Sequence, residues 1–180
     1  MSDNIVWIVD EDASADEAPA LAARVRDWLV AERIVAPGPG EVEDGTLLLR
    51  RGDAAPAWDT FPCEWRIIPC GLEVSVGRRV FHTGGNGIDG IGCPACGTVH
   101  DADDLPWSDA VEAWLLEEGD DAMACGTCGA CRGIADWAFE MPWGFGHLAF
   151  GFWNWPVGER LRDEVARLTG HRCRLVYEHI

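Results

Sequence analysis

Apolar residues recur at two spacings along this chain, and the change of spacing divides its first third into strands and a helix. The run Asn4–Val9 is almost continuously apolar, β-branched and aromatic, which is typical of a buried strand. Between Glu17 and Val35 the apolar positions follow helical spacing and form one face, made of Leu21, Val25, Trp28 and Leu29. A further apolar run, Thr46–Arg50, predicts the next strand, so this segment indicates a strand–helix–strand unit.

The middle of the chain mixes a β pattern, a glycine-rich loop and a short helical pattern. Apolar and polar residues alternate from Leu72, and Gly77-Arg78 is typical of a tight turn, so we expect a β-hairpin over Leu72–His82. The glycine-rich stretch that follows predicts a loop. Further on, a short amphipathic helix ending at Gly119 is indicated by the spacing of Trp107, Val111, Trp114 and Leu115.

The last third repeats the strand–helix–strand order. An aromatic strand is expected over His147–Pro156, a helix over Glu159–Thr169 with Gly170 as its stop, and a closing strand over 173–180. Two such units around a middle insert predict an α+β fold, a mixed sheet with helices on one face. We expect residues 1–90 and 134–180 to form this core, and 91–133 to form an inserted lobe.

Two cysteine pairs border that insert and give it candidate chemistry. The first is Cys93-Pro-Ala-Cys96-Gly and the second is Cys125-Gly-Thr-Cys128-Gly. A Cys-x-x-Cys turn directs both sulfurs to one point, and the glycine after it tolerates a left-handed backbone. Two such turns supply four thiolates, which can lie about 2.3 Å from one tetrahedral Zn²⁺ in a closed structural site. The pairs resemble zinc-ribbon knuckles, although the 28 residues between them require an inserted helix.

Other interpretations of the cysteines remain open at this point. The same knuckles resemble those of rubredoxin, which would imply iron and electron transfer, and Cys-Gly-Thr-Cys is similar to a thioredoxin-type redox motif. The thiols could also be buried without a metal. The second pair of ligands could be Cys128 and Cys131 instead, because these two also form a Cys-x-x-Cys motif, and His100 could replace a ligand. Cys63 and Cys70 are interpreted as small buried hydrophobic residues.

The net charge of the chain limits the classes of partner that it can bind. The chain carries 31 Asp and Glu against 14 Arg and no Lys, for a net charge of −17. Direct binding to nucleic acid is disfavoured, because such binding depends on Lys and Arg contacts to phosphate, and lysine-dependent chemistry is excluded. Residues 101–121 hold nine acidic residues and no basic one. We expect this lobe to bind a protein with a basic surface, through Asp101, Asp103, Asp104, Asp109, Glu112, Glu117 and Glu118.

A second acidic group, Asp10, Glu11 and Asp12, directly follows the first strand. A magnesium site is one interpretation of such a cluster, and a solvated acidic turn is the one we prefer. The chain contains no serine nucleophile elbow and no His-Glu-x-x-His motif, and a closed four-thiolate site leaves no catalytic position. No apolar run is long enough for a membrane helix and no secretory signal is visible, so we expect a cytoplasmic protein.

The pattern "GFWNWP" followed by "GHRCRLVYEHI", together with the N-terminal strand and helix, resembles a family of small uncharacterised bacterial proteins. The resemblance implies a bacterial origin and little about activity. The sequence therefore predicts a non-enzymatic cytosolic protein with a structural four-cysteine zinc site, serving as a protein-interaction, inhibitor or immunity-type module. A rubredoxin-like iron electron carrier and an enzyme with an unrecognised site are the alternatives.

Overall fold

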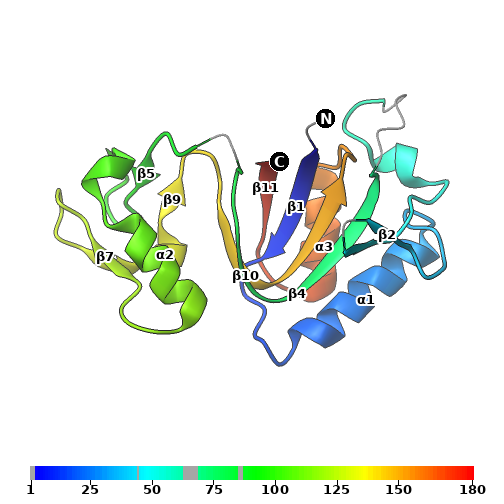
Figure 1. Ribbon diagram of the computed structural model, residues 1–180, viewed down its shortest axis with the longest axis horizontal. Coiled ribbons are helices and arrows are strands. Elements are labelled where there is room, and N and C mark those ends of the chain that lie inside the picture. The colour runs from blue at the N-terminus through cyan, green and yellow to red at the C-terminus, as the bar shows by residue number, and fades with distance from the viewer. Residues whose placement is uncertain (1–2, 44, 63–68, 85–86) are drawn as a thin grey trace.

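The computed structural model describes residues 3–43, 45–62, 69–84 and 87–180. Its largest sheet has four strands, in the order β11 (Cys173–His179), β1 (Asn4–Asp10), β10 (Gly144–Trp153) and β4 (Gly71–Phe81). The helices α1 (Ala18–Ala31) and α3 (Glu159–Thr169) lie together against one face of this sheet (Figure 1). The α+β class with helices on one face is thus confirmed.

The core between helices and sheet explains why these elements pack as they do. Alternate residues of β1 and β10, among them Ile8 and Phe150, face the apolar stripes of both helices. Leu161 and Val165 of α3 and Leu29 of α1 are fully buried there. Removing apolar side chains of this size from water contributes about 1.5–3 kcal/mol each, which makes this face the main source of stability.

Two expectations about the sheet are wrong in detail. Neighbouring strands pair antiparallel throughout, whereas a mixed sheet was expected; among the described residues, parallel pairing is limited to the isolated bridge between Gly84 and His179. The predicted third strand, β3 (Thr46–Leu48), pairs with β2 (Glu41–Glu43) in a separate hairpin. A bridge from Leu49 to Leu72 connects this segment to the sheet, so the first unit adds one strand to the sheet rather than two.

Helix ends follow local backbone chemistry. Helix α3 has the predicted bounds, because Gly170 adopts the left-handed conformation (φ +82°) that stops it. Helix α1 is shorter than predicted. The chain turns at Arg33, which has φ +58°, and the amides of Ile34 and Val35 bond back to the carbonyl of Leu29. Ile34 and Val35 are buried although they lie outside the helix. Their apolar side chains continue the helical pattern beyond its end, which is why the sequence predicted a longer helix.

The predicted hairpin over Leu72–His82 is one long strand. Gly77 has φ +124°, but with Arg78 it forms a bulge opposite His147 of β10 rather than a turn. The bulge bends the β4–β10 ribbon, so its far end curls over the second face of the sheet (Figure 1). The ring centre of Phe81 thereby lies 4.8 Å from that of Trp7, with the two ring planes tilted by 51°. A second small core fills this face and consists of Ile5, Trp7, Val9, Phe81, Ala149 and Val176.

A smaller lobe extends from the curled ribbon on the left of Figure 1. It contains the sheet of β6 (Val99–His100), β5 (Ile91–Gly92) and β9 (Ala138–Phe139), the hairpin of β7 (Ala122–Ala124) and β8 (Cys131–Gly133), and α2 (Trp107–Leu116). Three 3-10 turns complete the described elements, at Ala55–Trp58, Ala102–Asp104 and Ile134–Asp136. The boundary expected at residue 133 stays a prediction, and Trp137, Phe139, Trp143 and Phe145 beyond it share the lobe's core with Ile91 and Met123.

Candidate metal centre

Each cysteine pair forms the turn of its own β-hairpin. Residues 93–98 connect β5 to β6, and residues 125–130 connect β7 to β8. The hairpin strands therefore fix both ends of each turn. Cys93 and Cys125 begin the two turns, and both are almost completely buried in the core of the lobe.

The two turns have the same backbone geometry. In the first, the Cys93 amide donates to the carbonyl of Thr98, and the Gly97 amide donates to the carbonyl of Cys93, both at 2.9 Å. The second repeats this pattern at 2.9 Å, with Cys125 bonded to Ala130 and Gly129 bonded to Cys125. The glycines have φ +74° and +72°, the left-handed conformation that a side chain would disfavour. Two segments 32 positions apart thus fold into matching knuckles.

The matching turns bring four thiols together. The Sγ atoms of Cys93, Cys96, Cys125 and Cys128 all lie within 4.8 Å of one another. The distances across the knuckles are 3.9 Å from Cys93 to Cys128 and 3.8 Å from Cys96 to Cys125. Ligands at about 2.3 Å from a tetrahedral zinc are about 3.8 Å apart, so this cluster could hold a metal ion.

Electrostatics within the cluster also favour a bound cation. The backbone amide of Cys128, the amide of Thr127 and the ring of His100 lower the pKa of Cys125 to about 5. The Ala130 amide lowers the pKa of Cys128, but contacts with the thiols of Cys96, Cys125 and Cys93, together with some desolvation, outweigh it and raise this pKa to about 11. The Cys125 thiol therefore ionises readily, and its negative neighbours make ionisation of the Cys128 thiol more difficult. A bound divalent cation would allow all four thiols to ionise.

The two alternative ligands take different positions. His100 contacts the cluster from β6, with its Nε2 atom 3.2 Å from Sγ of Cys125 and its ring 6.2 Å from that of Trp137. At this distance the His100 ring can hydrogen-bond to the Cys125 sulfur. Cys131 is exposed on strand β8, opposite Ala124, and does not belong to the group of four. Cys131 lies after the second knuckle and not within it, because the left-handed residue that closes the turn is Gly129 and not Arg132.

The remaining cysteines lie away from the cluster. Cys63 falls outside the described residues. Cys70 is half-buried at the start of β4 and packs against the main core. Burial, followed by the charge of Asp10, raises the pKa of Cys173 to about 12, which makes its thiol a poor nucleophile.

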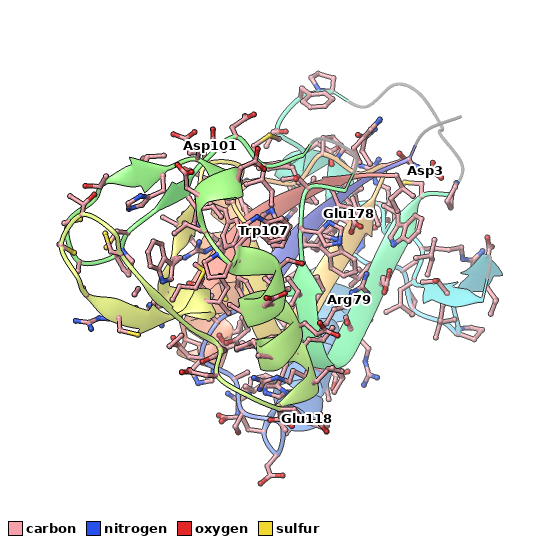
Figure 2. All side chains as sticks on the ribbon, turned by 60° about the vertical axis from the view of Figure 1, so that its left-hand side comes forward. Asp3, Arg79, Asp101, Trp107, Glu118 and Glu178 are labelled. Atoms are coloured by element: carbon pink, nitrogen blue, oxygen red, sulfur yellow. The ribbon has the colours of Figure 1, made fainter. Side chains whose placement is uncertain are left out.

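The acidic residues between the knuckles surround helix α2. All seven predicted partner-binding acids are exposed: Asp101, Asp103, Asp104, Asp109, Glu112, Glu117 and Glu118. Figure 2 shows Asp101 and Glu118 near the two ends of the helix. Two of the seven also have structural roles. The Asp101 carboxylate accepts from the Asp103 amide, and Glu117 pairs with Arg78 of β4 at 3.3 Å.

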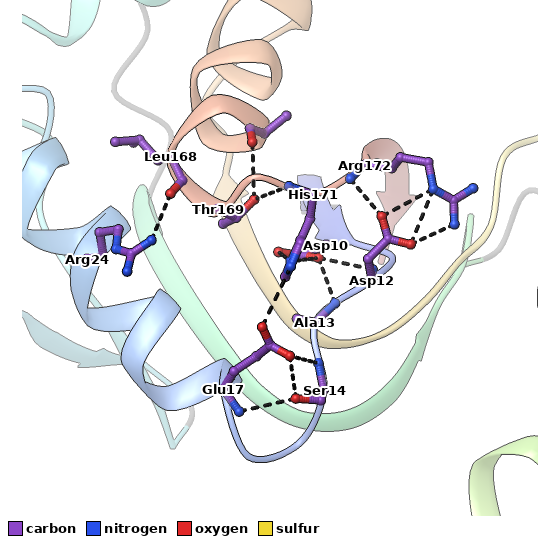
Figure 3. A network of polar contacts seen from close by, with 11 residues as sticks. Asp10, Asp12, Ala13, Ser14, Glu17, Arg24, Leu168, Thr169, His171 and Arg172 are labelled. Atoms are coloured by element: carbon purple, nitrogen blue, oxygen red, sulfur yellow. Dashed lines mark hydrogen bonds and ion pairs between the residues drawn. The ribbon is translucent and has the colours of Figure 1, made fainter.

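The acidic group after β1 is paired and Asp10 is buried, so our preferred interpretation, a solvated turn, is wrong for Asp10, whereas Asp12 is exposed. Asp10 is fully buried, accepts hydrogen bonds from the amides of Asp12 and Ala13, and contacts Nδ1 of His171 at 3.0 Å (Figure 3). Glu11 pairs with Arg174 and Asp12 with Arg172. One histidine and two arginines from the distant C-terminal segment thus engage the three carboxylates, and local sequence carries no signal for such long-range pairing.

No protein-family model, curated protein or solved structure matches the chain. The resemblances to zinc-ribbon and bacterial proteins therefore stay predictions. Within the part of the chain that the structure describes, no helix combines the length and the apolar content that crossing a bilayer requires.

Proposed function

We propose that Cys93, Cys96, Cys125 and Cys128 hold one structural Zn²⁺, and that the surrounding lobe is a protein-interaction module. The observation that carries the proposal is the pair of matching knuckles with four thiols within 4.8 Å. Four protein thiolates complete a tetrahedral site, which leaves no open position for a substrate or a reactive water. Zinc would supply a cross-link between the two hairpins.

Metal content and colour distinguish zinc from iron. We expect the purified protein to be colourless and to contain one zinc per chain by elemental analysis. Cys96→Ser should abolish stoichiometric binding, whereas Cys131→Ser, which changes an equally exposed thiol outside the cluster, should retain it. A red protein with stoichiometric iron would instead favour the rubredoxin-like carrier. Stoichiometric zinc in Cys96→Ser would contradict the assignment of ligands.

The acidic lobe is the surface that we assign to a partner. Of its seven exposed acids, Asp101 caps the 3-10 turn and Glu117 pairs with Arg78. The other five have neither role: Asp103, Asp104, Asp109, Glu112 and Glu118. A zinc ion with four thiolates adds a net −2 to the same lobe. Complementary charge accelerates association and selects partners, so a protein with a basic surface, such as a basic toxin or nuclease, fits this lobe.

Charge reversal tests the partner assignment. A candidate partner captured with the zinc-loaded protein should bind more weakly as salt rises, because exposed charges are screened. Reversing Asp103, Asp104, Asp109 and Glu112 together should reduce its affinity by at least tenfold. The matched control also reverses four exposed acids, chosen on the helical side of the sheet: Asp16, Asp27, Glu32 and Asp163. Equal effects of the two sets would remove the acidic lobe as the binding surface.

The four clustered cysteines, Cys93, Cys96, Cys125 and Cys128, are thiols and not disulfides, which suits a reducing compartment. We therefore assign the protein to the cytoplasm, with no membrane or nucleic-acid partner. Fractionation of cells that express the tagged chain tests the location directly.

A further inference from the structure

The bulge in the main sheet directs one arginine toward the acidic helix. Gly77 and Arg78 of β4 together oppose His147 of β10, and a bulge of this kind changes the direction of the side chains that it carries. The Nε atom of Arg78 donates to the carbonyl of Trp114 at 2.6 Å, near the end of α2, and its guanidinium lies 3.8 Å from the centre of that indole ring. The end of α2 is thereby attached to the main sheet.

Two acceptors share one nitrogen of this guanidinium. The Nη1 atom of Arg78 lies 3.3 Å from Oε1 of Glu117, which caps α2, and 3.3 Å from Nε2 of His147. Because arginine stays protonated and has no acceptor, Nη1 can only donate to the imidazole. The contact therefore requires a neutral His147 with its proton on Nδ1. Histidine is also the side chain that ordinarily changes its charge between pH 5 and 8.

The other charged groups on the neighbouring strands are engaged elsewhere. On β4, Arg79 pairs with Glu73 at 3.3 Å, and its guanidinium lies over aromatic rings of the sheet. On β1, which pairs with the other side of β10, buried Asp10 bonds to His171. Among the described residues, the charged group in contact with the imidazole is therefore Arg78, and the carboxylate that caps α2 contacts the same nitrogen of Arg78.

We propose that His147 is a pH-sensitive release for α2: the neutral ring accepts from Arg78 and holds the helix on the sheet, and the protonated ring repels Arg78 and loosens the helix. A proton on Nε2 removes the acceptor and places a second positive charge beside the guanidinium. The same charge attracts Glu117, so it competes with Arg78 for that carboxylate. Because the Arg78 side chain is only 23% exposed, water and salt screen the repulsion only in part. The attachment is present at neutral pH and is lost as the pH falls.

Release of α2 changes the surface that we assign to a partner. Asp109 and Glu112 lie on this helix, and Glu117 follows it. A loosened helix has to be ordered again when a partner binds, which lowers the affinity. This consequence rests on the proposed partner-binding function. The attachment of α2 to the sheet does not, and it can be measured on the protein without a partner.

Hydrogen exchange of the full-length, metal-loaded chain at pH 7.5 and 5.5 tests the release. After correction for the intrinsic pH dependence of exchange, protection of α2 should fall by about fivefold at pH 5.5. A complete hydrogen bond to a charged group contributes about tenfold or more, and part of the histidine is still neutral at this pH. His147→Gln keeps an acceptor that does not titrate, so its α2 should stay protected at both pH values. His147→Lys is charged at both and should show the lower protection already at pH 7.5.

Two controls separate the release from other effects of acid. His82→Gln changes an exposed histidine at the end of β4 and should keep the pH dependence of the parent chain. Protection of β7 and β8, measured in the same sample, should stay constant while the metal remains bound. An equal fall in His147→Gln and the parent chain, or equal protection of α2 in His147→Gln and His147→Lys at pH 7.5, would overturn the proposal. These comparisons do not depend on which metal the lobe holds, so a wrong assignment of zinc is distinguishable from a wrong assignment of His147.

Discussion

The guanidinium of Arg78 lies 3.8 Å from the centre of the Trp114 ring, and its Nε donates to the Trp114 carbonyl at 2.6 Å. Arg78 lies in β4 next to the bulge, and Trp114 belongs to α2. The same guanidinium pairs with Glu117 and contacts His147 of β10 at 3.3 Å each. One side chain of the bent ribbon therefore joins the end of the acidic helix to the main sheet.

Loss of Arg78 should loosen the acidic helix. Arg78→Ala removes a cation–π contact and a charged hydrogen bond, for which we expect a loss of about 2 kcal/mol in the free energy of unfolding. Hydrogen exchange should accelerate mainly in α2. Arg78→Lys should recover only part of the loss, because Lys cannot stack and donate in the same geometry. Arg26→Ala, which breaks an exposed pair with Asp27, should change stability by about 0.5 kcal/mol or less. Unchanged exchange in α2 would show that Arg78 does not attach it.

Removal of the metal should unfold the knuckles of the smaller lobe and leave the main sheet folded. The main sheet has its own cores on both faces, whereas each knuckle is held by a hairpin of two to three residues per strand. A chelator, or Cys96→Ser, should therefore abolish amide protection in β7 and β8 and leave β1 and β10 protected. Hydrogen exchange followed by mass spectrometry measures both regions in one sample. Simultaneous loss of protection in β1 would mean that the metal supports the whole fold.

His100 should strengthen metal binding without ligating the metal. Its Nε2 atom is 3.2 Å from Sγ of Cys125, a contact that can stabilise the thiolate. Partners of this kind typically change metal affinity by about 10–100-fold, so His100→Ala should weaken zinc binding by about tenfold while one zinc still binds per chain. His82→Ala, an exposed histidine outside the cluster, is the control in a competition titration with a chromogenic chelator. Loss of stoichiometric zinc in His100→Ala would instead make His100 a ligand.

The pairing of Asp12 with Arg172 should give stability a defined pH dependence. Hydrogen bonds from the Arg172 side chain and amide hold the pKa of Asp12 below its ordinary value of 3.8. A carboxyl with a lowered pKa in the folded state stabilises the fold above its ordinary pKa, and this contribution disappears as pH falls through the folded pKa. Asp12→Asn should therefore cost about 1 kcal/mol or less at neutral pH, since Arg172 is largely exposed.

The difference between Asp12→Asn and the parent chain should then shrink as pH is lowered below about 4, in urea titrations at several pH values. Asp16→Asn, in the same loop and exposed, is the control. A difference that stayed constant down to the acid transition would contradict the role of Arg172.

Asp10 should be the most costly of the acidic residues to replace. Its buried carboxylate bonds to the amides of Asp12 and Ala13 and to the ring of His171 (Figure 3). Asp10→Ala leaves these donors without their acceptor, so we expect a loss of about 3 kcal/mol. Asp10→Asn keeps an acceptor oxygen and should cost less. A thermal or urea titration in which Asp10→Ala lost under about 1 kcal/mol would mean that water replaces the carboxylate.

The sequence alone determined the features that depend on neighbouring residues. Helix α3 matches its predicted bounds, since an amphipathic period and a stop glycine are both local. The two knuckles were predicted for the same reason: a Cys-x-x-Cys turn followed by glycine specifies its own backbone.

Tertiary structure decided what depends on distant partners. The hairpin predicted around Gly77 is one bent strand because β10 pairs with it on both sides of the bulge. Asp10 is buried because His171 comes to it from 161 positions away, and His100 contacts Cys125 because two separate hairpins converge. Local patterns fix local conformation, but which surfaces meet is settled only when distant segments pack together.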